Sequence, residues 1–237
     1  MPVAVRAVLC DLDDTLFDHT HASRCAVGEL HRAVPAFTCW SADEFTGRHR
    51  EMLETLHLEV LAGRLSISSA RIERFKRLLV AANGVDPDRV APEVAQTYRR
   101  AYETAWQTLP GAGPLLSALK ARGIRTAVVT NNLASEQRDK LARCGLAADV
   151  DALVTSEEVG VQKPDPRIFQ VALDRLEVRP EEAVMVGDAW ATDIEGARAA
   201  GVRPIWLNRF GVTSPDPAVQ EIRRLDPIED VIELILP

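Results

Sequence analysis

Short apolar runs alternate with amphipathic stretches between residues 115 and 208, and this alternation constrains the fold more than any other feature of the sequence. The runs read IRTAVVT, VDALVTS, EAVMVGD and VRPIWLN, and the stretches between them carry apolar residues at helical spacing. Nearly continuous runs of Val, Ala and Ile are typical of a parallel sheet that helices cover on both faces. The run Val3–Cys10 has the same composition, so we expect it to join the same sheet.

Between the first apolar run and the segment LPGAGP, nearly ninety residues show only helical patterns separated by breakers. Ser41 followed by Glu44 predicts a capping box at the start of one of these helices. The sequence therefore predicts an α/β protein with two domains. Residues 1–17 and 107–237 form the core, and residues 18–106 form a helical domain inserted after the first strand.

The net charge and the cysteine content limit the classes of binding partner and the cellular compartment that we expect. The chain has 237 residues, 46% of them hydrophobic, and a net charge of −7. A nucleic acid or an anionic membrane surface needs a basic footprint, so we expect neither as a partner. The four cysteines form no CxxC pair, and no stretch approaches the ~20 apolar residues that cross a bilayer. We therefore expect reduced thiols in a cytoplasmic protein.

Polar side chains follow the ends of four predicted strands. They are Asp11, Asp13, Asp14 and Asp18 after the first, Thr130 and Asn131 after the second, Lys163 in the loop after the third, and Asp188 and Asp193 after the fourth. In an open parallel sheet, these ends meet at one edge, where ligands bind. Crowded carboxylates repel one another and lose hydration when buried, so we expect a cation there. A solvated acidic turn is the alternative for the first group.

Four motifs occur in a fixed order, DLDDTL, VVTNN, QKPDPRIF and GDAWATD, and together they resemble the haloacid dehalogenase-type (HAD) superfamily over the whole chain. The helical insert between the first and second motifs resembles the subfamily that carries a helical cap. The resemblance implies a Rossmann-like core, Mg²⁺, and hydrolysis of a phosphate ester through an aspartyl-phosphate.

The resemblance also assigns roles to residues. Asp11 would be the nucleophile, and Asp13 the general acid and base. The hydroxyl of Thr130, the backbone N–H of Asn131 and the charge of Lys163 would hold the phosphoryl oxygens. The expected Mg²⁺ ligands are Asp11, the backbone carbonyl of Asp13, Asp188 and Asp193. The predicted function is an Mg²⁺-dependent phosphatase for a small phosphorylated metabolite, active as a monomer or homodimer.

Several alternatives stay open at this point. A sugar phosphomutase would keep all four motifs, and a phosphoacceptor or other non-catalytic binding protein would share the acidic edge. The presence of Asp13 and Asp188 disfavours a 2-haloacid dehalogenase, which uses no metal. Asp14 and Asp18 are interpreted as solvated turn or cap residues. Asp193 also fits a helix-capping pattern, TDIE. The identity of the substrate is not predicted.

Overall fold

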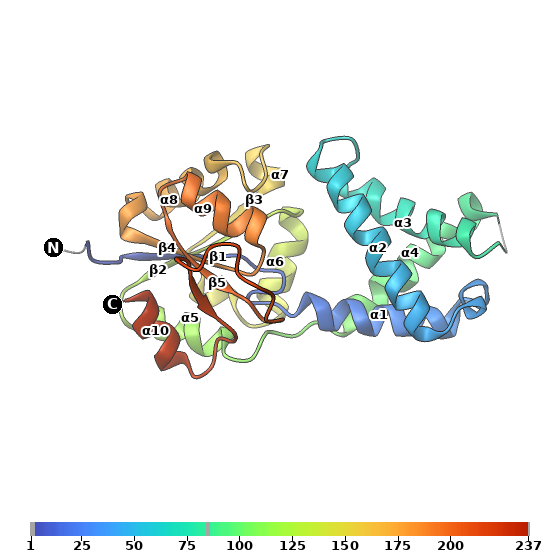
Figure 1. The fold of residues 1–237 in the computed structure, drawn as a ribbon, viewed down its shortest axis with the longest axis horizontal. Coiled ribbons are helices and arrows are strands. Elements are labelled where there is room, and N and C mark those ends of the chain that lie inside the picture. The colour runs from blue at the N-terminus through green and yellow to red at the C-terminus, as the bar shows by residue number, and fades with distance from the viewer. Residues whose placement is uncertain (1–2, 84–85, 237) are drawn as a thin grey trace. The chain divides into compact units, whose positions relative to one another are not determined.

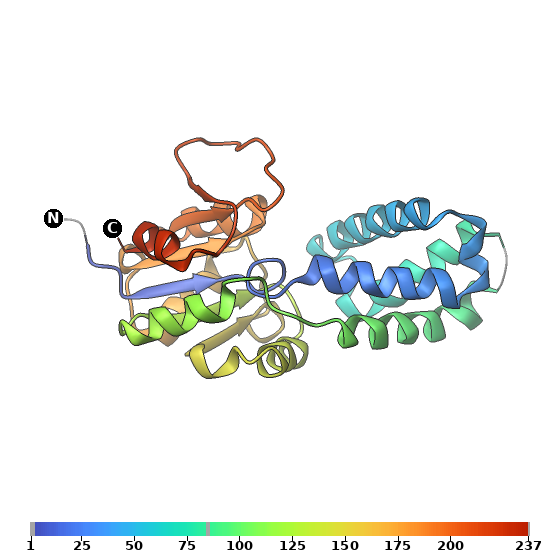
Figure 2. The same cartoon turned by 90° about the horizontal axis from the view of Figure 1, so that it is seen from below.

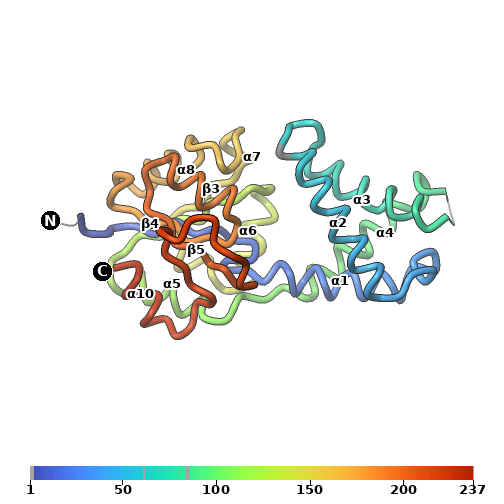
Figure 3. Tube along the Cα trace, viewed as in Figure 1, coloured from blue at the N-terminus to red at the C-terminus, as the bar shows by residue number. Residues whose placement is uncertain are grey.

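The protein was analysed as a computed structural model that describes residues 3–83 and 86–236, and its chain divides into two compact units (Figure 1). One unit comprises Met1–Asp18 and Gln107–Pro237, and the other comprises His19–Trp106. The chain leaves the first unit after Asp18 and returns to it at Gln107. Figure 3 traces its course. We describe each unit by itself.

The first unit is built on a six-stranded parallel sheet with the strand order β3-β2-β1-β4-β5-β6. The strands are β1 (Ala7–Cys10), β2 (Arg125–Thr130), β3 (Ala152–Thr155), β4 (Ala183–Gly187), β5 (Arg203–Leu207) and β6 (Gln220–Ile222). In the central register, Leu9 pairs with Ala127 on one side and with Met185 on the other. The chain therefore builds the sheet outward from β1 to β3 and then returns to the far side of β1 with β4.

Helices cover both faces of this sheet (Figure 2). They are α5 (Ala112–Ala121), α6 (Ala134–Arg143), α7 (Ser156–Val159), α8 (Pro166–Leu176), α9 (Glu195–Ala199) and α10 (Ile228–Ile235). Helices α8 and α9 lie on one face and α5 and α10 on the other (Figure 1). The first face buries Leu9 and Val129 of the sheet against Phe169 and Leu173 of α8. The predicted α/β fold with a parallel, helix-covered sheet is confirmed.

Two details of this unit differ from the sequence-based expectation. The apolar run Val3–Cys10 is a strand only from Ala7, because pairing to both neighbouring strands begins there. The sheet also gains the short edge strand β6, which the sequence analysis did not predict. Its three residues, two polar and one apolar, give too short a pattern to distinguish a strand from a loop.

The second unit is helical. It contains α1 (His19–Ala33), α2 (Ala42–Leu61), α3 (Ile67–Ala81) and α4 (Pro87–Thr104). The capping box at the start of α2 is confirmed: the backbone N–H of Ser41 donates to Glu44 Oε2 at 2.8 Å, and the backbone N–H of Glu44 donates to Ser41 Oγ at 3.3 Å. Phe37, Phe45 and Phe75 are fully buried in its core. Among the residues that the structure describes, no helix is both long and apolar enough to cross a membrane.

The two chain segments that lead out of the first unit and back into it lie side by side. The backbone N–H of Asp18 donates to the carbonyl of Gln107 at 3.0 Å, and that of Leu109 donates to the carbonyl of Leu16 at 2.9 Å. Both hydrogen bonds belong to the first unit, and they tie the turn after β1 to the segment that precedes α5.

Candidate active site

The carboxyl ends of β1 and β4 place two acidic residues next to each other. Asp11 follows β1 and Asp188 follows β4, and these strands are neighbours in the sheet. The chain changes direction across the sheet between these two strands, and such switch points are where open α/β sheets bind ligands. The fold therefore brings together at this edge the first and fourth groups of acids that the sequence places far apart.

A buried lysine joins this edge. Lys163 Nζ lies 2.6 Å from Asp11 Oδ1 and 2.7 Å from Asp193 Oδ1, and the side chain of Lys163 is only 2% exposed. The loop that carries Lys163 is held by the side chain of Asn131. The Lys163 N–H donates to Asn131 Oδ1 at 2.7 Å, and Asn131 Nδ2 donates to the Lys163 carbonyl at 2.9 Å. Asn131 thus orients the lysine, and its own predicted phosphate contact, through the backbone, stays a prediction.

Asp11, Asp188 and Asp193 form a compact group of carboxylates, with one oxygen from each lying within 4.8 Å of the others. Asp193 lies in a π-helical turn, Trp190–Ile194, and accepts the backbone N–H of Ala189 at 3.0 Å. A Cβ at Gly187 would collide with the Asp193 carboxylate, so this position requires glycine. No side-chain capping bond forms at the start of the π-helical turn, but Asp193 does lie in its first turn, as the alternative held, and its carboxylate also contacts Lys163.

The group holds three carboxyl groups and one cation, Lys163. Burial raises the pKa of Asp11 to about 7, although Lys163 opposes the shift. Burial, together with Asp11 and Asp193, raises the pKa of Asp188 to about 9. Despite its burial, Asp11 and Asp193 raise the pKa of Lys163, which therefore stays charged. Three hard oxygen donors with one cation between them fit a divalent metal ion such as Mg²⁺, which prefers oxygen ligands and neutralises the excess charge.

Asp13 has partners of its own on the segment after β2. Lys140 Nζ lies 2.5 Å from Asp13 Oδ1, and Gln137 Nε2 donates to Asp13 Oδ2 at 3.0 Å. Gln137 Nε2 also donates to Thr130 Oγ1 at 2.7 Å. Since the Thr130 hydroxyl accepts this bond, its proton remains available to a phosphoryl oxygen. Asn132 Nδ2 approaches Asp13 Oδ2 at 3.5 Å, the limit of a hydrogen bond.

The sequence analysis missed Gln137 and Lys140. Lys140 follows Glu136 by one helical turn, a spacing typical of a solvated ion pair. The side chains of Lys140 and Glu136 are buried instead, with exposures of 1% and 5% respectively. One signal was present: Ala134, Gln137 and Leu141 repeat at helical spacing, so a polar residue occupies a position of the buried stripe of α6.

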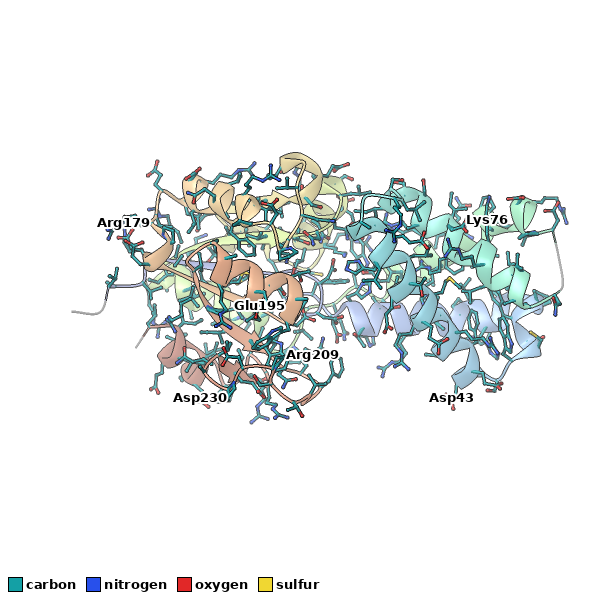
Figure 4. The ribbon with its side chains drawn as sticks, turned by 45° about the horizontal axis from the view of Figure 1, so that its top comes forward. Asp43, Lys76, Arg179, Glu195, Arg209 and Asp230 are labelled. Atoms are coloured by element: carbon teal, nitrogen blue, oxygen red, sulfur yellow. The ribbon has the colours of Figure 1, made fainter. Side chains whose placement is uncertain are left out.

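Asp14 and Asp18 are not the solvated residues that the sequence suggested. Both bind Arg209, which follows β5 and is labelled in Figure 4. Its Nη1 lies 2.8 Å from Asp14 Oδ1, and its Nη2 lies 3.2 Å from Asp18 Oδ1. Asp14 adopts a left-handed φ of 64°, and its N–H donates to the Phe17 carbonyl at 2.7 Å. Arg209 therefore fixes the turn that presents Asp13.

Comparison with known proteins places this site in a family. The model of the haloacid dehalogenase-like hydrolases matches residues 5–201. This chain belongs to the haloacid dehalogenase-like hydrolases. A phosphoserine phosphatase from Thermus thermophilus is 32% identical to it over 96% of this chain and 98% of its own. A glyceraldehyde 3-phosphate phosphatase from Methanopyrus kandleri is 33% identical over 86% of this chain and 84% of its own.

A solved structure of the same hydrolase family matches the fold. The HAD-hydrolase YfnB from Bacillus subtilis, bound to magnesium, superposes with a TM-score of 0.83 at 25% identity, and the match covers 98% of this chain and all of that one. Family membership and the Rossmann-like fold predicted from the four motifs are thus confirmed. All seven predicted site residues lie at the sheet edge, in two groups: Asp11, Asp188, Asp193 and Lys163 with Asn131 beside it, and Asp13 with Thr130.

Proposed function

We propose that this hydrolase is a phosphatase that cleaves the phosphate monoester of a small metabolite, with Asp11 as nucleophile and Mg²⁺ as cofactor. One observation carries the proposal: the buried Asp11 carboxylate contacts Lys163 and faces two further carboxylates, while Asp13 has a separate cationic partner. By their names, these relatives act on phosphoserine and on glyceraldehyde 3-phosphate, which share a phosphate monoester on a three-carbon skeleton and differ in their other functional groups. This supports the reaction class and leaves the substrate open.

The carboxylates of Asp11, Asp188 and Asp193 and the backbone carbonyl of Asp13 are the groups that would hold Mg²⁺. When bound, the ion neutralises negative charge, so that a carboxylate and a phosphate can approach each other. Lys163 would supply a second fixed positive charge beside Asp11, positioned before the substrate arrives.

In the first step, an Asp11 oxygen attacks phosphorus, the bond from phosphorus to the leaving oxygen breaks, and Asp13 protonates that oxygen. In the second step, Asp13 takes a proton from water, which attacks the phosphorus of the aspartyl-phosphate. The phosphorus–oxygen bond to Asp11 then breaks, which releases inorganic phosphate and regenerates the carboxylate. Thr130 and the backbone N–H of Asn131 would hold the other phosphoryl oxygens through both steps.

Residues 18–106 would form the cap domain that encloses a small substrate, which excludes water during the first step. The core would then comprise residues 1–17 and 107–237. We also propose a cytoplasmic location with reduced thiols, and a monomer or homodimer as the active form.

The test is release of inorganic phosphate from a panel of phosphorylated metabolites, with Mg²⁺ and with a chelator. We expect Mg²⁺-dependent release that Asp11→Asn abolishes and that Asp43→Asn leaves intact. Asp43 is a matched control because it is an exposed aspartate in the first turn of α2 (Figure 4). Transfer of phosphate to a second hydroxyl would instead identify a phosphomutase, halide release from 2-haloacids a dehalogenase, and silence on the whole panel a binding protein.

A further inference from the structure

The helical unit contains a buried cation, Arg74, that has no acidic partner. Arg74 lies on α3 and is only 6% exposed. Within the described part of the chain, no carboxylate lies within ion-pair distance of it. Arg77, less than one turn further along the same helix, shows the ordinary arrangement: it is more exposed and pairs with Glu73 at 2.8 Å and with Glu59 at 3.1 Å. Burial of an arginine without a compensating anion is costly.

Aromatic rings surround the guanidinium and compensate only part of this cost. Its Cζ lies 4.6 Å from the ring centroid of Phe75 and 4.4 Å from that of Tyr98. Cation–π contacts of this kind are weaker than a hydrogen-bonded ion pair, and they use the faces of the rings, not the N–H donors of the arginine. Arg74 Nε is buried and has no hydrogen-bond partner. Burial accordingly lowers the pKa of Arg74.

A second buried donor lies beside Arg74. His49 on α2 is 2% exposed, its ring stacks on Tyr98 at 5.3 Å, and its Nε2 has no hydrogen-bond partner. Burial, with the nearby charges of Arg74 and His19, holds the pKa of His49 well below its ordinary value. Ser23 on α1 adds a hydroxyl, 3.0 Å from the Tyr98 hydroxyl. Side chains from all four helices thus meet around Arg74.

The titratable groups that act on Arg74 and His49 include no carboxyl group, although Tyr98 hydrogen-bonds Arg74 and raises its pKa. They are the two residues themselves, Arg71, His19, Tyr98 and Tyr102. A cluster of N–H and O–H donors around a guanidinium, with no carboxylate, has the composition of an anion site before its anion binds.

We propose that Ser23, His49, Arg74 and Tyr98, here called the Arg74 cluster, form an anion-binding site of the helical unit for a carboxylate or phosphate group. The planar donors of Arg74 match the two oxygens of such a group, and His49 Nε2 supplies a further donor in its N–H form. The anion has two possible sources. It is a second anionic group of the substrate, in which case the inference rests on the proposed function, or it is a separate small anion, in which case it does not.

Kinetics test the first source. We would compare matched pairs of phosphate monoesters that differ by one carboxylate or one phosphate, such as 3-phosphoglycerate against glycerol 3-phosphate. The intact protein should prefer the member with the extra anion by about tenfold or more in kcat/KM, the effect of one charge-assisted hydrogen-bonded contact. Arg74→Gln should reduce this ratio to within about twofold of unity, whereas Arg77→Gln on the same helix should leave it unchanged.

Thermal unfolding tests the second source, with sodium malonate against sodium chloride at equal ionic strength. A separate carboxylate anion should raise the Tm of the intact protein and of Arg77→Gln by about 2–4 °C and should leave that of Arg74→Gln unchanged. Turnover of p-nitrophenyl phosphate by the intact protein, whose leaving group offers no carboxylate or second phosphate, reports on the proposed function separately. Its absence would remove the proposed function, while malonate binding would still decide the anion site.

Either positive result supports the site. The proposal is overturned if the intact protein shows neither the substrate preference nor the malonate effect, or if Arg74→Gln retains the effect that is found. The results on the intact protein stand even where Arg74→Gln does not fold. In that case Arg74→Lys, which keeps the charge and loses the fork, should show a weakened preference or Tm shift, and an undiminished one would count against the site.

Discussion

Lys163 and Arg74 are both buried cations, but the two units surround them in opposite ways. Lys163 is 2% exposed and contacts two of three clustered carboxyl groups, so the acids of its site outnumber the cation. Arg74 is 6% exposed and lies among aromatic rings and neutral donors, so its site carries excess positive charge. The difference shows that each site lacks a charge of opposite sign: the site around Lys163 fits a divalent cation, and the site around Arg74 fits an anion.

Removal of Lys163 should have the largest effect on the protein. Lys163→Met leaves Asp11 and Asp193 buried without their cation, so we expect the free energy of unfolding in chelator to fall by about 3–5 kcal/mol. Loss of the fixed charge should also lower kcat by roughly 10²–10³-fold. Urea unfolding and phosphate release measure the two effects. An unchanged free energy of unfolding for Lys163→Met in chelator would show that Asp11 and Asp193 do not need Lys163 to compensate their charge.

Lys140 should have the next largest effect on turnover. Lys140→Met removes the cation that holds Asp13, which makes Lys140 a positioning residue, and we expect kcat to fall by about 10²-fold for alkyl phosphates. The loss should be much smaller for p-nitrophenyl phosphate, because its leaving group needs no proton. Arg138→Gln, an exposed arginine on the same helix, is the control. An equal loss on both substrates would show that Lys140 does not act through protonation of the leaving group.

Metal binding should stabilise the protein more at high pH than at low pH. The pKa values of about 7 for Asp11 and about 9 for Asp188 lie above the ordinary 3.8, so between about pH 4 and 9 the unfolded chain has lost protons that the folded chain keeps. In chelator these two groups therefore make stability fall as pH rises through that window, and the fall ends above it.

Mg²⁺ binds the ionised carboxylates and should offset this loss, by about 2–3 kcal/mol near pH 9 at a hundredfold excess over Kd and by less near pH 6. Thermal unfolding across this pH range, with Mg²⁺ and with chelator, measures the difference. Equal stabilisation by Mg²⁺ at both pH values would show that these carboxylates are not the ligands.

Arg74 should give the smallest effect on stability, with the opposite sign to Lys163. Arg74→Met replaces a buried, unpaired cation with an apolar side chain, so in an anion-free buffer we expect a change between zero and a gain of about 1 kcal/mol. Urea unfolding beside Lys163→Met measures it directly. If Arg74→Met lowered the free energy of unfolding as much as Lys163→Met does, the interactions of Arg74 within the folded helical unit would already compensate its burial. The two buried cations would then not differ in this respect.

Most of the fold could be predicted from the sequence, because the patterns that indicate it are local and repeated. The strand–helix alternation from residue 115 onward predicted the parallel sheet, and Ser41 with Glu44 predicted the start of α2. The edge strand β6 escaped prediction because its three residues are too few to show a period. The start of β1 was not predicted either, because the apolar composition begins at Val3 whereas pairing to the neighbouring strands begins at Ala7.

The candidate site was predicted where residues follow strand ends and missed where they lie inside helices. Asp11, Lys163 and Asp188 stand in loops at strand ends, and parallel topology alone brings such positions together. Gln137 and Lys140 stand in α6, where polar residues are expected to face solvent, and only tertiary packing turns them toward Asp13. No feature of the sequence singles out Arg74, because no local pattern separates a buried arginine from an exposed one.

The most direct test of the account is to look for the phosphoryl group on Asp11. Asp13→Asn, which lacks the base for the second step, would be incubated with p-nitrophenyl phosphate and Mg²⁺, quenched in acid and digested for mass spectrometry. We predict the mass of one added phosphoryl group on the peptide that contains Asp11, and its absence when Asp11→Asn is combined with Asp13→Asn. Release of p-nitrophenol without phosphorylation of that peptide, or phosphorylation that survives Asp11→Asn, would contradict the assignment of Asp11 as the nucleophile.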